Sequence, residues 1–311
     1  MFAARCAGIS LAVFVLLYVP LSLLVSHGWR FSLRVLKLRS PRSKADLLCV
    51  LRVLPFVVAS VFTFVFTLPS FLLLEPRSTD EAVGTAPLIL GFCCVLLLVI
   101  GIGKTASAQF KTRQALARWL DGSELMERCT SVPVFRTRQH APSLTVAGVH
   151  DPKVLVSEDA LAALTSAELR VALKHEMAHV RYYDNLKKLL FRLSSFPGMQ
   201  ELERTWSEET ELAADDAAVS SSHEALDLAS ALIKVSRLNS VHAPVLTTGL
   251  LHSSTALGTR VKRLFSWQAE QPSRNYWWYA LPPIAATLLF TVVTYGSTLN
   301  RLHDATEWLV R

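Results

Sequence analysis

The residues best able to do chemistry form one short run, His175-Glu176-Met177-Ala178-His179, in which two histidines lie four positions apart. Residues at this spacing share one face of a helix, so both imidazoles can reach a single ion. Zinc binds neutral imidazole nitrogens, and a catalytic zinc site keeps one position open for water. We therefore predict that His175 and His179 bind Zn²⁺, which lowers the pKa of that water towards about 7. Glu176 is then the catalytic base that takes the proton as the water attacks a peptide carbonyl. The alternative is a solvated helix face that carries these residues by chance.

A third metal ligand is expected from the acidic segment 208–216. Two histidines and one glutamate form a known catalytic zinc set. Glu211 is our choice, because the small residues Ala213 and Ala214 follow it and allow its helix to pack closely on the motif helix. Asp215, four residues later on the same face, is expected to accept the second ring N–H of a ligand histidine.

Other polar residues allow two interpretations each. A tetrahedral oxyanion needs a hydrogen-bond donor beside the metal, so His223, His252 and Arg260 are candidates for stabilising the transition state. The alternative for each is an ordinary surface or structural role. Asp184, five residues after His179, is either a surface ion-pair partner near the membrane or a residue that shapes the site.

The local sequence also indicates the elements that position these residues. Ser157 is expected to cap a short helix that reaches Leu164, and Thr165-Ser-Ala-Glu168 matches a capping box for the longer helix that holds the motif. Short β-branched segments between turn residues predict strands near 132–135, 144–149 and 154–157, whereas helices are expected at 110–128, 200–220 and 224–238.

The composition indicates a membrane protein, with 51% hydrophobic and 18% charged residues and a mean hydropathy of +0.34. Crossing a bilayer takes about 20 apolar residues. Four stretches reach that length, at about 7–26, 53–74, 84–103 and 275–300. A cleaved signal peptide is the alternative for the first, but its apolar run is too long for one. The five cysteines include no CxxC pair, so the sequence supports neither a disulfide framework nor a cysteine zinc site.

The charges of the short loops predict the orientation. The loop between the first two stretches carries Arg30, Arg34, Lys37, Arg39, Arg42 and Lys44 against Asp46 alone, and the next loop is mainly acidic. Lysine and arginine stay on the cytoplasmic side. We therefore predict three membrane helices in residues 1–103, a cytoplasmic zinc metallopeptidase domain at 104–274, a fourth span and a short external tail at 301–311. The net charge of +7 then reflects topology and anionic lipid, and no nucleic acid partner is expected.

Five segments occur in a specific order along the chain: 146–157, 164–169, 174–179, 184–185 and 211–215. In this order they resemble the metallopeptidase domain of the BlaR/MecR antibiotic-sensor family. The resemblance implies an α+β protein in which four membrane helices carry a cytoplasmic gluzincin-type domain of helices and a small sheet. It also implies zinc ligation by His175, His179 and Glu211, catalysis by Glu176, and binding of the substrate as a strand added to the sheet edge.

The chain ends after the predicted fourth span, where sensor members of that family carry an extracellular penicillin-binding domain, so antibiotic sensing is not expected. The HtpX-like and CAAX-protease-like membrane metallopeptidases share the motif and the downstream Glu-x-x-x-Asp and are the second assignment. We expect a multi-pass zinc endopeptidase of a bacterial-type inner membrane that cleaves a cytosolic or membrane-associated protein, in signalling or regulation. The alternatives are a quality-control or processing protease and a non-proteolytic transducer that keeps zinc for structure. Glu176 argues against the transducer, because a structural site does not need this carboxylate.

Overall fold

The computed structural model describes residues 2–74, 84–126, 132–138, 141–238, 246–249, 254–268 and 294–305. This part of the chain is mostly helical and contains one small mixed sheet. Three helical segments are long and apolar enough to cross a membrane, Arg5–Leu36, Pro41–Leu74 and Thr85–Leu120. Of the predicted fourth span, residues 275–293 lie outside the described residues. Its last residues, 294–300, belong to a helix that continues to position 305.

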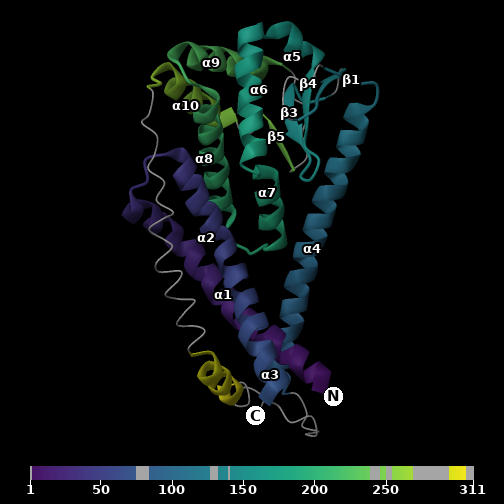
Figure 1. Ribbon diagram of the computed structural model, residues 1–311, viewed down its shortest axis with the longest axis vertical. Coiled ribbons are helices and arrows are strands. Elements are labelled where there is room, and N and C mark those ends of the chain that lie inside the picture. The colour runs from purple at the N-terminus through teal and green to yellow at the C-terminus, as the bar shows by residue number, and fades with distance from the viewer. Residues whose placement is uncertain are drawn as a thin grey trace.

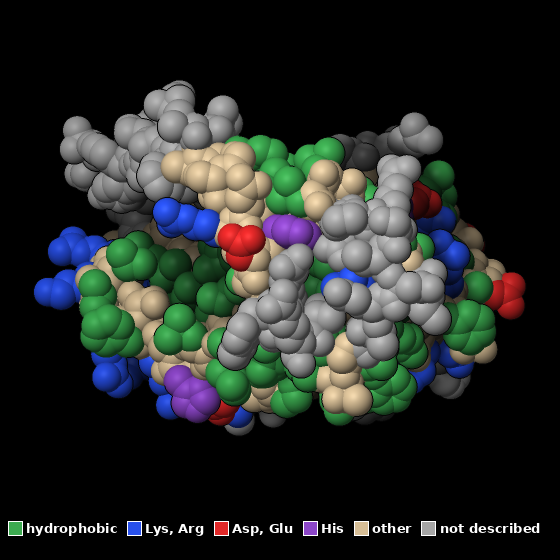
Figure 2. Space-filling view, turned by 90° about the horizontal axis from the view of Figure 1, so that it is seen from below, with side chains coloured by type: hydrophobic (Ala, Val, Ile, Leu, Met, Phe, Trp, Pro, Cys, Tyr) green, Lys and Arg blue, Asp and Glu red, His purple; other side chains and the backbone are tan. Residues whose placement is uncertain are grey.

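The candidate membrane helices continue past the apolar stretches that predicted them. They are α1 (Phe2–Leu36), α2 (Pro41–Phe62), the π-helical turn η1 (Thr63–Thr67), α3 (Leu68–Leu74) and α4 (Thr85–Leu120). Helices α1 and α2 lie side by side, and α4 diverges from them toward the sheet (Figure 1). Hydrophobic side chains cover much of the end of the molecule at which α3 lies (Figure 2). The helix expected at 110–128 is confirmed only as far as Leu120, where it continues α4 without a break. Gly122 then turns the chain with a positive φ of 68, and Glu124–Leu125 form a strand instead of helix.

The sheet has the order β1-β2-β4-β3-β5, in which β2 and β4 are parallel and the other neighbours are antiparallel. Its strands are β1 (Glu124–Leu125), β2 (Val134–Thr137), β3 (Leu144–Ala147), β4 (Lys153–Ser157) and β5 (Thr247–Gly249). The three predicted strands are therefore confirmed to within a few residues. The sequence missed β1 and β5, which are too short to show an alternating pattern.

Six helices accompany the sheet: α5 (Glu158–Ala163), α6 (Ser166–Arg181), α7 (Asp184–Leu193), α8 (Gln200–Ala218), α9 (Ser222–Arg237) and α10 (Ser254–Phe265). The Ser157 hydroxyl accepts a hydrogen bond from the Ala160 N–H, and both hydrogen bonds of the capping box between Thr165 and Glu168 are present. These contacts confirm the predicted starts of α5 and α6. Helix α7 was not predicted.

Two buried hydrophobic clusters join the sheet and the helices. The first lies between the sheet, α6 and α9, and Val156, Ala172 and Leu232 belong to it. The second joins α1 and α2 to α8, where Trp29 and Trp206 are both buried. A fully buried large apolar side chain stabilises a fold by about 1.5–3 kcal/mol. Because residues of α1, α2 and α8 share the second cluster, these candidate membrane helices pack directly on the helix that carries Glu211.

Candidate metal centre

Three side chains of the predicted site converge in the structure. His175 and His179 lie on α6, and Glu211 lies on α8; all three are buried. One ligand atom from each residue lies within 4.8 Å of the others. The two histidine Nε2 atoms are 3.2 Å apart, and the Glu211 carboxylate oxygens lie 3.6 Å from the first and 3.7 Å from the second. Two imidazole nitrogens and a carboxylate oxygen form a donor set that suits a divalent transition-metal ion.

Small side chains bring the two helices close enough for this arrangement. Helix α6 packs on α8, and Ala213 and Ala214 beside Glu211 are 3% and 0% exposed. On α6, Ala178 lies between Glu176 and His179 and is also buried. The observed packing agrees with the reason for which Glu211 was chosen from its acidic segment.

Each histidine has a carboxylate next to its other ring nitrogen. Nδ1 of His175 lies 3.0 Å from Oδ1 of Asp215, and Nδ1 of His179 lies 2.7 Å from Oδ2 of Asp184. A carboxylate at this position holds the proton on Nδ1 and leaves the Nε2 lone pair for an ion. Asp215 thus lies where the sequence predicted. Asp184, for which a surface ion pair was the alternative, is 1% exposed and belongs to the site.

Glu176 is fully buried, and neither of its carboxylate oxygens has a hydrogen-bond partner among the residues that the structure describes. Burial raises the pKa of this carboxyl to about 8. Leaving a buried polar group without a hydrogen bond costs folding free energy, so such groups are rare without a functional reason. The side chain is therefore available to a water molecule or a ligand, as catalysis beside a metal requires.

Arg260 of α10 binds two acidic residues of α8, Glu211 and Asp215. Its guanidinium donates hydrogen bonds to Asp215 at 2.7 and 2.8 Å and to Glu211 at 2.9 Å. Burial alone would raise the pKa of the Glu211 carboxyl, but Arg260 and the two imidazoles lower it well below its usual range. Arg260 was predicted only as a candidate oxyanion donor. The structure adds that it neutralises and orients the carboxylates next to the histidines.

The carboxylates of Asp215 and Glu211 also change the pKa of His175. Burial lowers its pKa, but the neighbouring carboxylates of Asp215 and Glu211 raise it more, to about 9. A negatively charged environment that favours a protonated imidazole also favours a bound cation. Because a ligand histidine must be neutral, metal binding at this site is expected to release a proton.

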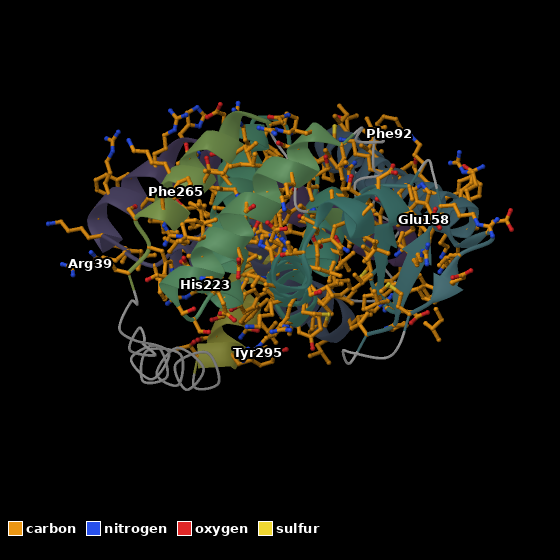
Figure 3. All side chains as sticks on the ribbon, turned by 90° about the horizontal axis from the view of Figure 1, so that it is seen from above. Arg39, Phe92, Glu158, His223, Phe265 and Tyr295 are labelled. Carbon is orange, nitrogen blue, oxygen red and sulfur yellow. The ribbon has the colours of Figure 1, made fainter. Side chains whose placement is uncertain are left out.

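The other two candidate oxyanion donors do not join this cluster among the described residues. His223 lies at the start of α9 (Figure 3), where its side chain is 85% exposed and 3.8 Å from Asp227. His252 lies outside the described residues.

Lys188 is a functional candidate that the sequence reasoning missed. Its Nζ donates a hydrogen bond of 2.8 Å to the carbonyl oxygen of Thr247 on the edge strand β5. Burial lowers the pKa of this amine, although the charges of Glu211, Asp184 and Glu176 oppose the change. The sequence feature that could have identified Lys188 is its position four residues after Asp184, which places both side chains on one face of a helix.

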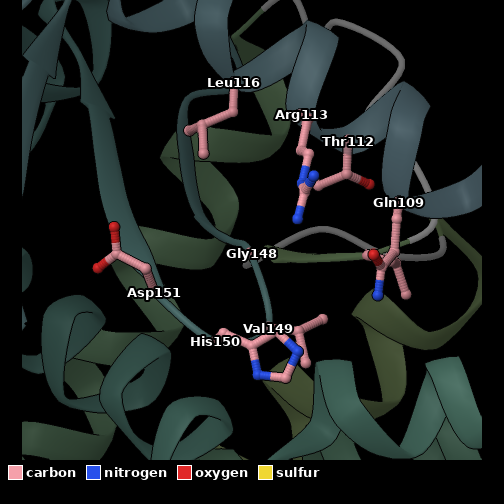
Figure 4. A pocket seen from close by; sticks show the side chains of 9 residues that line it. Gln109, Thr112, Arg113, Leu116, Gly148, Val149, His150 and Asp151 are labelled. Carbon is pink, nitrogen blue, oxygen red and sulfur yellow. The ribbon is translucent and has the colours of Figure 1, made fainter.

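A separate cavity of about 190 Å³ lies between α4 and the turn that follows β3 (Figure 4). It is lined by Gln109, Thr112, Arg113, Leu116, Gly148, Val149, His150, Asp151 and Leu246, and by none of the clustered residues. One contact links it to the site, because the Gly148 carbonyl accepts a 3.0 Å hydrogen bond from Asn185, the neighbour of Asp184.

Comparison with known proteins identifies the family. Residues 87–264, more than half of the chain, match the peptidase family described as BlaR1 peptidase M56. The matched region begins in α4 and ends in α10, so it includes the clustered histidines and carboxylates. No curated protein shows a significant match to the chain. Peptidases of this family are membrane-associated metallopeptidases, in agreement with the three apolar helices and the candidate metal centre. The chain belongs to the BlaR1 peptidase M56 family.

Proposed function

We propose that the protein is an integral-membrane, zinc-dependent endopeptidase that hydrolyses peptide bonds of a cytosolic or membrane-associated protein, in signalling or regulation. The main support is the buried Glu176 carboxylate, which lacks a hydrogen-bond partner among the described residues and neighbours His175 in the motif. A structural zinc site is closed by four protein ligands and does not need such a group.

The proposal assigns a role to each residue of the cluster. His175, His179 and Glu211 would hold the zinc ion, and Asp215 and Asp184 would orient the two imidazoles. When bound, zinc acts as a Lewis acid that lowers the pKa of water and polarises a carbonyl.

Glu176 takes the proton of the attacking water and then passes it to the leaving amine. Because burial raises the pKa of this carboxyl, its anion is a stronger base than that of an exposed glutamate.

The edge of the sheet offers a binding mode for an extended substrate. Strand β5 pairs with β3 on one side and has no strand on its other side among the described residues. It also packs against α6, the helix of the two histidines. A peptide added to β5 as a further strand would gain main-chain hydrogen bonds and run beside the metal centre.

The test is proteolysis by the purified full chain in lipid, with an unfolded protein as substrate. We expect cleavage by the wild type and a loss of at least about 10²-fold in the Glu176→Gln variant, with zinc content unchanged. Glu208→Gln, at a partly exposed position of α8, is the matched control and should cleave normally. Equal cleavage by wild type and Glu176→Gln would refute the assignment of the base.

The cellular substrate can be sought with the same pair of proteins. Membrane and cytosolic proteins that are shortened in cells with the wild type and intact in cells with Glu176→Gln are the candidates. If the two sets of proteins are identical, the proposed endopeptidase activity has no support in the cell.

A further inference from the structure

Helix α7 connects the metal centre to the sheet through three side chains near its start. Asp184 contacts His179 at 2.7 Å, and Asn185 donates a 3.0 Å hydrogen bond to the carbonyl of Gly148. One turn later, Lys188 binds the edge strand β5 at Thr247. The position of α7 therefore sets both the orientation of a metal-binding histidine and the support of the strand at the sheet edge.

The other end of α7 is held by all three candidate membrane helices. Tyr18 of α1 donates a 2.8 Å hydrogen bond to the carbonyl of Ser194, the residue that ends α7. Lys104 of α4 donates to the hydroxyl of Ser195 at 2.8 Å. Gly101 of α4 lies so close that a Cβ there would collide with the carbonyl oxygen of Leu193. Figure 1 shows α7 between the diverging helices α2 and α4.

Arg52 of α2 makes the most extensive of these contacts. Its side chain is 2% exposed, and it donates to the carbonyls of Phe191 at 2.8 Å and Ser194 at 2.9 Å and to the Ser194 hydroxyl at 3.1 Å. Nε donates to Glu203 of α8 at 2.7 Å. The last carbonyls of a helix lack partners within the helix and form its negative end, so a cation there satisfies them. A planar guanidinium can serve several acceptors at once, which a lysine amine on the same stem cannot.

We propose that Arg52 is a positioning residue for the metal centre, which it reaches by fixing the carboxyl end of α7. This inference rests on the proposed function, in which His179 is a zinc ligand. The helix is ten residues long, about 15 Å, and a short rigid helix transmits a displacement of one end to the other. Loss of the Arg52 contacts would therefore loosen the Asp184–His179 contact, although Arg52 touches neither residue in the described contacts.

The test measures the zinc dissociation constant of the full chain in lipid by competition with a chelator, without substrate. Loss of the partner of a ligand histidine typically weakens metal binding 10–100-fold. For Arg52→Lys and Arg52→Met we expect weakening at the low end, about tenfold. Glu203→Gln, which removes only the ion pair, should change the constant by less than twofold. Arg30→Met is the matched control, since Arg30 joins α1 to Glu201 of α8 through an exposed ion pair.

A double-mutant cycle separates positioning from general loss of stability. If Arg52 acts through Asp184, adding Arg52→Lys to Asp184→Asn should weaken zinc binding no further. Additive effects, or wild-type zinc affinity in folded Arg52→Lys, would overturn the inference. Gly101→Ala displaces the same end of α7 from α4 and should also weaken binding if the Arg52 variants do not fold; unchanged affinity in it would equally overturn the inference.

The two proposals fail separately in these measurements. A wild-type protein that binds zinc and cleaves nothing would contradict the proposed function and leave the positioning result intact. A wild-type protein that cleaves, together with an Arg52→Lys variant of unchanged zinc affinity, would do the reverse.

Discussion

The Asp184 carboxylate lies 2.7 Å from Nδ1 of His179, although the two residues belong to different helices. Tyr183 between them adopts a left-handed conformation with φ 55, which is uncommon for a residue with a Cβ. This conformation ends α6 and starts α7 in a new direction. Six consecutive residues, 179–184, thereby supply both a candidate metal ligand and the group that orients it.

Asp184→Asn tests this pair directly. The amide keeps the shape of the carboxylate but removes the negative charge that orients and polarises the imidazole. We expect zinc binding to weaken about 10–100-fold, as measured by chelator competition. Asp227→Asn, which removes the carboxylate beside the exposed His223, is the control and should bind zinc as the wild type does. An unchanged constant in Asp184→Asn would show that the contact does not support the metal.

Metal ligation by His179 and Glu211 is tested by metal content. His179→Ala removes one of three donors, so the purified variant should contain far less zinc than the wild type. Glu211→Gln should retain zinc more weakly, because a neutral amide replaces an anionic oxygen. His223→Ala is the matched histidine control. Full zinc occupancy in His179→Ala would contradict the ligand assignment.

Removing the metal from the wild type should have the same functional result. A chelator is expected to abolish cleavage, and excess zinc should restore it. Proteolysis that persists at full strength in metal-free protein would contradict a role for the ion in the reaction.

Arg260→Met tests the buried charge network. Without the guanidinium, Glu211 and Asp215 lose their buried cation, and removing one partner of a buried ion pair costs about 3–5 kcal/mol. We expect thermal unfolding of the chelator-treated variant to shift downward accordingly. Arg263→Met, on the same helix, breaks a partly exposed pair with Asp216 and should cost about 1 kcal/mol or less. Similar shifts in the two variants would argue against this explanation.

Glu168 predicts a pH dependence of stability. Burial raises the pKa of its carboxyl, but hydrogen bonds from Lys234, Ser230 and the Thr165 N–H lower it more, from 4.5 to about 2. Because the folded pKa is depressed, the stabilisation is present above pH of about 4.5 and is lost as the pH falls toward about 2. Its full size is no more than about 3 kcal/mol.

The measurement compares the thermal unfolding midpoints of the wild type and Glu168→Gln at pH values from about 6 to about 3. The wild type should lose more stability on acidification than the variant, because only the wild type has this carboxylate to protonate. Parallel pH profiles would contradict the assignment. Glu208→Gln, whose side chain is partly exposed, is expected to follow the wild type.

Local patterns explain why several elements, and the three side chains that converge in the candidate metal centre, were predictable. The capping box at Thr165 and the spacing of His175 and His179 are properties of neighbouring residues, so the helix and its metal-binding face follow from them. Glu211 could be chosen because Ala213 and Ala214 indicate a close helix contact. By contrast, α7 starts after a left-handed tyrosine, a conformation that the residue type does not reveal.

The sequence by itself determined the apolar helices, the motif helix and the types of the groups that can bind a metal, because each depends on composition or on short spacing. Only the tertiary structure decided that Asp184 lies against His179, that Arg260 lies against Glu211, and that Arg52 holds the end of α7. These contacts join residues of different helices, and the packing of α2, α6, α7, α8 and α10 fixes them. Packing depends on the combined fit of many side chains, which no single stretch of sequence records.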